Sequence, residues 1–204
     1  MWSCSIAGII GCLIYIPIYY VLIHYLPEEC RQSKIFYGIL AGMVILFFMT
    51  TPLWCYSWPS FLAAAGFSIS ASVIIATDWS CCWIPDEPII LLLIIDGFML
   101  AGQYIIIDSM VCTVSLFFYV GLYLLFPKGI GSGDIKLAAA LCLGCPGQSA
   151  YIMTAAAFFS AAAGAFIYQR FHRTSKIPFG PYLLLGWWCA AVIGGECIEW
   201  LLFI

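Results

Sequence analysis

Long apolar segments with almost no charge dominate this chain of 204 residues and limit what it can fold into. Hydrophobic residues make up 65% of the chain and charged residues only 8%, whereas a soluble domain carries about a quarter charged residues. A helix of about 20 apolar residues crosses a bilayer. The apolar residues follow one another without alternation, so a transmembrane β-barrel fits poorly. The sequence therefore predicts an all-α protein, a polytopic transmembrane helical bundle.

Prolines, glycines and charged residues mark the ends of the apolar segments. We expect helices over about residues 3–26, 35–53, 60–77, 88–103, 108–126, 135–143, 148–170 and 181–204. The sixth is shorter than a full span, so it is either a tilted short helix or a re-entrant segment. If it crosses, there are about eight spans, one of them short, in a single membrane-embedded domain over residues 1–204.

The basic residues predict an orientation. All seven fall in connections that eight spans put on one side: Arg31, Lys34, Lys128, Lys136, Arg170, Arg173 and Lys176. Cytoplasmic loops are enriched in Lys and Arg, so that side is expected to face the cytoplasm. Asp78 and Asp134 then lie at the same cytoplasmic face, each at the end of a span. The net charge of −3 and the lack of a basic tract indicate no nucleic-acid partner.

Residues 129–136 form the most unusual polar stretch, with three alternating glycines followed by Asp134 and Lys136. Glycine allows positive φ and lets another chain approach closely. Asp134 alone could be a helix N-cap, but a cap does not require the glycines. We expect Asp134 to be functional, with Gly131 and Gly133 leaving room for a substrate backbone. Lys136 either steadies nearby charge or simply lies at the membrane interface.

Asp78 is the second carboxylate of interest. Alone it could be an ordinary aspartate where a span meets water. Paired with Asp134 it resembles an aspartic-protease dyad, in which one carboxyl keeps a proton while the other acts as a base. Asp86 is interpreted as starting a helix, and Asp96 as a buried polar contact inside the bundle or part of a water path.

No metal or cofactor is expected from the cysteines. The chain has eleven of them, scattered through apolar segments, where they behave most simply as small hydrophobic residues. Cys142 and Cys145 form one C-x-x-C pair, but a structural zinc site needs four ligands.

Three blocks together resemble the type IV prepilin peptidases, membrane aspartic proteases of the GxGD class. Asp78 followed by Ile84-Pro85-Asp86 is similar to that family's aspartate, six residues, then Pro-Asp or Pro-Asn. Residues 129–137, Gly-Ile-Gly-Ser-Gly-Asp-Ile-Lys-Leu, are close to its G-x-G-x-G-D-x-K-L. Residues 177–182, Ile-Pro-Phe-Gly-Pro-Tyr, are similar to its I-P-F-G-P block. The blocks occur in the expected order.

The resemblance implies an aspartic endopeptidase with Asp78 and Asp134 as its catalytic pair. Its substrate would be a prepilin or pseudopilin with a short basic leader, a glycine at the cut and a hydrophobic helix after it. Cleavage would occur at the cytoplasmic face of a prokaryotic cell membrane. Bifunctional members carry an N-methyltransferase domain after the first helix. The corresponding connection here, Glu28 to Lys34, is too short for a domain, so this chain resembles the peptidase-only branch.

Two other functions fit parts of the sequence. A presenilin-like intramembrane protease would share the Gly-x-Gly-Asp core, but its usual Tyr-Asp partner is absent because Thr77 precedes Asp78. A small proton-coupled transporter would use buried carboxylates, Asp96 above all, and would be expected to contain inverted repeats. No clear internal repeat is present. Neither the pilin or secretion system served nor the oligomeric state is readable from the sequence.

Overall fold

The structure, a computed structural model, describes residues 34–50, 58–103, 105–126, 130–145, 147–171 and 177–202, together with positions 13, 16, 17 and 20. Its long helices are α3 (Lys34–Thr50), α4 (Trp58–Cys81), α5 (Asp86–Ala101), α6 (Ser109–Leu125), α7 (Ser132–Leu143), α8 (Ser149–Phe171) and α9 (Gly180–Leu202). The all-α prediction is confirmed for this part of the chain. The helix expected over residues 3–26 lies outside it, apart from those four positions.

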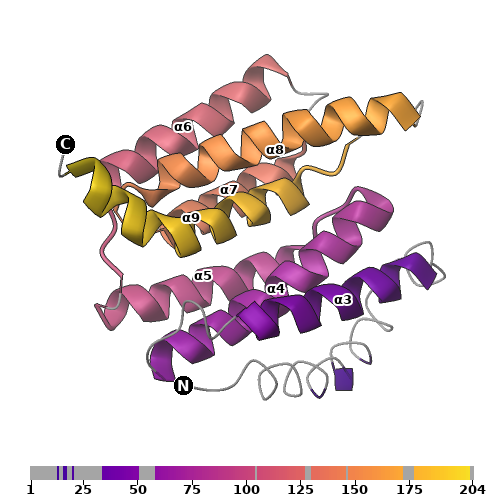
Figure 1. The fold of residues 1–204 in the computed structure, drawn as a ribbon, viewed down its shortest axis with the longest axis horizontal. Coiled ribbons are helices and arrows are strands. Elements are labelled where there is room, and N and C mark those ends of the chain that lie inside the picture. The colour runs from indigo at the N-terminus through magenta and orange to yellow at the C-terminus, as the bar shows by residue number, and fades with distance from the viewer. Residues whose placement is uncertain are drawn as a thin grey trace. The chain divides into compact units, whose positions relative to one another are not determined.

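The chain forms two compact units, Met1–Ile95 and Asp96–Ile204. In the first unit, α3 packs along α4 (Figure 1). Their common core contains Phe36, Leu40 and Val44, which recur every four residues along one face of α3 and meet Val73 and Ala76 of α4. The prediction of a single membrane-embedded domain is not tested by this division and stays a prediction.

Helix α4 carries hydroxyl side chains into the apolar interior of the first unit. Ser68, Ser72 and Thr77 are fully buried. Ser68 Oγ donates to the Ala64 carbonyl oxygen at 2.7 Å, and Ser72 Oγ and Thr77 Oγ1 likewise donate to carbonyls four residues earlier. Because the helix itself accepts these hydrogen bonds, the hydroxyls need no partner from another element.

The second unit is built around α6, α7, α8 and α9, which lie side by side in Figure 1. Cys112 Sγ, near the start of α6, donates to the carbonyl oxygen of Cys142, near the end of α7, at 3.1 Å, so these two helices are antiparallel. Helix α8 runs parallel to α6, and Tyr119 of α6 donates to Thr154 Oγ1 of α8 at 3.5 Å. Helix α9 runs antiparallel to α8, because Tyr182 near its start lies against Gly164 and the later Gly186 lies against Met153. Helices α7 and α9 therefore begin at the same end of this unit.

Small residues let α8 and α9 approach closely. A Cβ on Gly186 would collide with the backbone carbonyl oxygen of Met153, and a Cβ on Gly164 would collide with the Tyr182 phenol. Tyr182 belongs to the 177–182 block, so this block is held against α8 by a glycine contact. Close approach over small residues is a common way for helices to associate in membranes.

Two of the described helices contain stretches long and apolar enough to cross a membrane, Leu62–Cys81 in α4 and Ser149–Phe166 in α8. Phe36–Leu46 and Ser109–Leu125 are apolar but shorter. Large apolar side chains are exposed on the second unit, including Phe159 at 79% and Phe166 at 80%, which favours a lipid surface over water. The count of about eight spans stays a prediction.

Candidate active site

The first turn of α7 positions the Asp134 carboxylate. Gly131 is the N-cap of this helix, and Asp134 is its third residue. Asp134 Oδ2 accepts a hydrogen bond from the Gly131 N–H at 3.0 Å, while the Asp134 N–H donates to the Gly131 carbonyl oxygen at 3.2 Å. The interpretation of Asp134 as an N-cap is therefore wrong, because the helix starts two residues before it.

The other carboxylate oxygen of Asp134 has no hydrogen-bond partner in the part of the chain that the structure describes. Oδ1 is buried and makes no hydrogen bond to any described residue. A buried acceptor without a donor costs about 1–3 kcal/mol and more when it is charged. The helix thus fixes one oxygen of the carboxylate and leaves the other ready to bind a proton, a water or a substrate group.

Burial also changes the acidity of Asp134. Asp134 lies in the first turn of α7, just before the apolar residues 135–143 that we expected to form the short sixth segment. Desolvation raises the pKa of Asp134 from 3.8 to about 6, although the hydrogen bond from the Gly131 N–H lowers it. This carboxyl can therefore both hold and release a proton near neutral pH.

Glycine is required at position 131 because the Asp134 carboxylate lies close to it, and not because the backbone there has an unusual conformation. Its φ of −78° and ψ of 153° are extended, so this position does not use the positive φ that glycine allows. A Cβ on Gly131 would lie 3.2 Å from Asp134 Oδ2, closer than ordinary contact. Gly133 lies inside the first turn of α7, and Lys136 is exposed. Their roles toward a substrate stay predictions, and Gly129 lies outside the described residues.

Asp78 lies in the last turn of α4 and is only 4% exposed. We expected the helix to end at about Thr77, but it continues to Cys81. Trp79 and Trp83, on either side of the helix end, are 48% and 44% exposed. Tryptophan concentrates at membrane–water interfaces, so these residues favour an interfacial position for the end of α4.

The other two aspartates differ in their surroundings. Asp86 is exposed and is the first residue of α5, which confirms its interpretation as a helix start, where its charge is favourable. Asp96 belongs to the second unit and lies against the backbone of Gly144, at the end of α7: a Cβ there would be 2.6 Å from Asp96 Oδ1. Asp78 and Asp134 belong to different units, and their pairing stays a prediction.

The cysteines are not all inert apolar residues. Cys82, Cys112, Cys142, Cys145 and Cys189 are reduced, but Cys81, three residues after Asp78, is disulfide-bonded. The interpretation of the cysteines as small hydrophobic residues is wrong for Cys81. The described residues contain no cluster of three or more His, Cys, Asp or Glu side chains that could hold a metal ion.

Comparison with known proteins decides the family. The sequence profile of the Type IV leader peptidase family matches residues 62–167, just over half of the chain. The chain belongs to this family. The matched residues run from α4 into α8 and include Asp78 and Asp134, but not the 177–182 block.

A curated relative of this leader peptidase family member is the prepilin leader peptidase/N-methyltransferase of Aeromonas hydrophila. The two are 35% identical over 81 residues, which cover 37% of this chain and 27% of the relative. The chain thus matches little more than a quarter of that protein's length. No solved structure matches the chain.

Proposed function

We propose that this leader peptidase family member is a membrane aspartic endopeptidase that removes the leader of type IV prepilins or pseudopilins. Asp78 and Asp134 form its catalytic pair. The family supports a peptidase over a transporter, and the name of the Aeromonas relative supports a prepilin substrate. The connection from Glu28 to Lys34 has no room for a methyltransferase domain, so we expect no methyl transfer to the product from this segment.

The two carboxyl groups share the proton transfers of peptide hydrolysis. The ionised carboxylate takes a proton from a water molecule, whose oxygen attacks the scissile carbonyl carbon. The protonated carboxyl donates its proton to the carbonyl oxygen. The tetrahedral intermediate collapses when one of its hydroxyl groups returns a proton to the pair, the C–N bond breaks and the leaving nitrogen takes a proton from the pair, which again holds one proton. The pair titrates as a unit, so no fixed role is assigned to either residue.

One observation carries this proposal: the Asp134 carboxylate is held by the Gly131 N–H through one oxygen, while its buried second oxygen has no described partner. The hydrogen bond to Oδ2 stabilises the start of α7 as half of a capping box, but the buried Oδ1 without a described partner costs stability and adds nothing to that cap. Asp78 is also buried at a helix end. Ionisable groups in such apolar surroundings are functional candidates.

Co-expression with a prepilin tests the proposal. Asp78→Asn and Asp134→Asn are each expected to leave the protein in the membrane and to stop the size shift that leader removal produces. Asp108→Asn is the matched control, because Asp108 caps α6 through Met110 and Val111 and asparagine caps equally well. Full processing by Asp134→Asn would contradict the proposal.

The membrane face of the site follows from the basic residues, which predict that the end of α4 lies at the cytoplasmic side. The disulfide at Cys81 favours the opposite side, because disulfides are rare in a reducing cytosol. Labelling Cys82, which is exposed and reduced, with a membrane-impermeant maleimide decides between them. Our proposal predicts a Cys82-dependent label only after the membrane is opened; labelling of intact cells, absent from Cys82→Ser, would reverse the orientation.

A further inference from the structure

Each end of α7 has a glycine with a carboxyl group lying against it. At the start of the helix, Gly131 lies beside Asp134. At its end, Gly144 lies beside Asp96 of α5, and a Cβ on Gly144 would be 2.6 Å from Asp96 Oδ1 and 3.4 Å from Oδ2. Gly144 has φ −79° and ψ −3°, a right-handed conformation that is open to other residues. The requirement for glycine there therefore comes from the Asp96 carboxyl group.

The end of α7 does not stabilise an ionised Asp96. The Gly144 N–H already donates inside the helix, to the carbonyl oxygens of Ala140 and Cys142, so it is not free for the carboxylate. The C-terminal end of a helix also carries partial negative charge, which repels an anion. Cys145 lies within electrostatic reach of Asp96, but it is a buried thiol and supplies no positive charge. These surroundings favour the neutral carboxylic acid.

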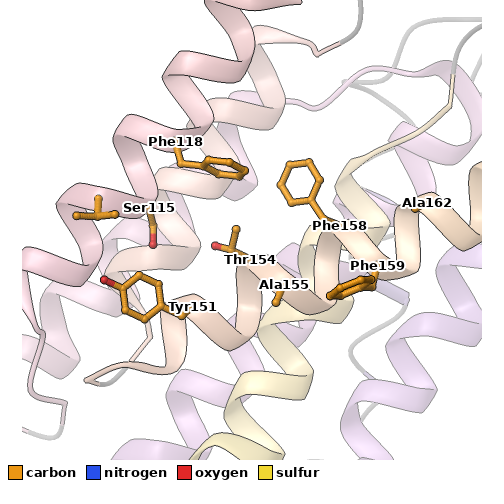
Figure 2. A pocket seen from close by; sticks show the side chains of 9 residues that line it. Ser115, Phe118, Tyr151, Thr154, Ala155, Phe158, Phe159 and Ala162 are labelled. Atoms are coloured by element: carbon orange, nitrogen blue, oxygen red, sulfur yellow. The ribbon is translucent and has the colours of Figure 1, made fainter.

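The helices of the second unit offer Asp96 no basic side chain. Lys, Arg and His are absent from residues 35–127, 137–169 and 177–204. Lys136 belongs to α7 itself, but it comes eight residues before Gly144, about 12 Å along the helix axis. Figure 2 shows that apolar and hydroxyl side chains line the groove between α6 and α8, so this groove supplies no cation either. Because an unpaired charge in apolar surroundings is costly, Asp96 is expected to keep its proton.

The end of α7 supplies acceptors for this proton. The last four carbonyl groups of a helix have no donor within it. The Cys142 carbonyl oxygen accepts a hydrogen bond from Cys112 Sγ of α6 at 3.1 Å. The Leu143 carbonyl does not receive this donor, and its peptide group leads directly into Gly144, against which the Asp96 carboxyl lies. A protonated Asp96 is therefore placed to donate to the helix end.

We propose that Asp96, as a neutral carboxylic acid, donates a hydrogen bond to the end of α7 and is a positioning residue for Asp134; the inference rests on the proposed function. Helix α7 is continuous over its 12 residues. A shift at Gly144 is therefore carried to Asp134, which lies about 15 Å away along the axis. Asp96 from α5 and Cys112 from α6 together fix the helix that carries the catalytic carboxyl group.

Initial rates of leader removal by four variants test the inference. Asp96→Asn keeps a neutral donor and is expected to retain kcat within about twofold. Asp96→Leu has a similar volume but no donor, so it should lower kcat about tenfold and leave KM unchanged. Gly144→Ala should also lower kcat, because its Cβ displaces the carboxyl group. Gly97→Ala is the matched control on α5, since a Cβ there meets no atom within 4 Å, and it should not lower kcat.

Two kinetic results would overturn the inference while leaving the peptidase proposal standing. Equal losses in Asp96→Asn and Asp96→Leu would show that a neutral donor is not enough, and full activity in both Asp96→Leu and Gly144→Ala would exclude a positioning role. A wild-type protein that cleaves no prepilin would overturn both proposals.

Infrared spectroscopy tests the proton without any need for activity. The difference between the spectra of the wild type and Asp96→Asn at neutral pH should contain the C=O stretching band of a protonated carboxyl group. A carboxylate band in its place would overturn the inference whatever the peptidase assay shows.

Discussion

Replacing Gly131 by alanine isolates the placement of the Asp134 carboxylate from every other property of the site. The extended backbone of Gly131, with φ −78° and ψ 153°, is open to alanine, so the substitution introduces no backbone strain. The added Cβ would lie 3.2 Å from Asp134 Oδ2. That contact is relieved when the carboxylate moves by a few tenths of an ångström, away from the Gly131 N–H that holds it.

The size of the effect follows from that displacement. A misplacement of about 1 Å can cost about 100-fold in rate, so a shift of a few tenths of an ångström is expected to lower kcat about fourfold to tenfold. Stability should hardly change. Alanine is a slightly poorer N-cap than glycine, but it restricts the unfolded chain, and the two effects are each within about 1 kcal/mol and of opposite sign.

Initial rates of leader removal in detergent or vesicles, together with thermal unfolding, measure both quantities. Gly121→Ala is the matched control, because Gly121 lies in α6 and a Cβ there would meet no atom within 4 Å. Full activity in Gly131→Ala would refute the reasoning, since the tight contact would then have no consequence for the carboxylate. A large loss of stability would refute it as well, because the backbone was argued to accept alanine.

Three further predictions concern pH, packing and capping. Burial raises the pKa of Asp134 from 3.8 to about 6, so the folded protein binds this proton more tightly than the unfolded chain does. The protonated carboxyl therefore stabilises the fold below pH 4, and this stabilisation is lost as pH rises through 6. Asp134→Asn should therefore remove up to about 3 kcal/mol of pH dependence between pH 4 and 7, measured by unfolding at both pH values; an unchanged slope would contradict the shift. Gly186→Ala should destabilise by about 1–3 kcal/mol, because its Cβ would meet the Met153 carbonyl oxygen, and an unchanged melting temperature would rule out the tight α8–α9 contact. Asp108→Ala should cost about 1 kcal/mol by removing the acceptor for two N–H groups of α6, whereas equal melting of Asp108→Ala and Asp108→Asn would show that the cap contributes nothing.

Much of the helical layout is predictable because apolar runs and their breaks are local properties. The expected helices over residues 108–126 and 148–170 end within one residue of α6 and α8. The helix end near Asp78 was placed too early, because Asp78, Trp79 and Ser80 look like a polar break although the backbone there is still helical. A polar side chain in the last turn of a helix can reach solvent or a buried partner, and the residue type does not distinguish these cases.

The site was less predictable in its details. The motif identified Asp134 but did not predict that α7 starts at Ser132. Nor did it predict the contact that makes glycine necessary at position 131. Both features depend on the Asp134 side chain turning back toward Gly131. The approach of Asp96 to Gly144 and the groove between α6 and α8 join residues that are far apart in sequence. The hydrophobic periodicity of the sequence does not predict such contacts. Nor does the sequence show which cysteine is oxidised.

The distance between the carboxyl groups of Asp78 and Asp134, measured in a structure of the chain bound to a leader peptide in lipid, tests the catalytic pair most directly. A water shared by both groups lies within about 3 Å of each. The proposed mechanism therefore predicts carboxyl oxygens no more than about 6 Å apart, with the scissile carbonyl beside them. A bound, cleavable peptide with the two carboxyl groups more than about 10 Å apart would contradict the pair, since no single water could then join them.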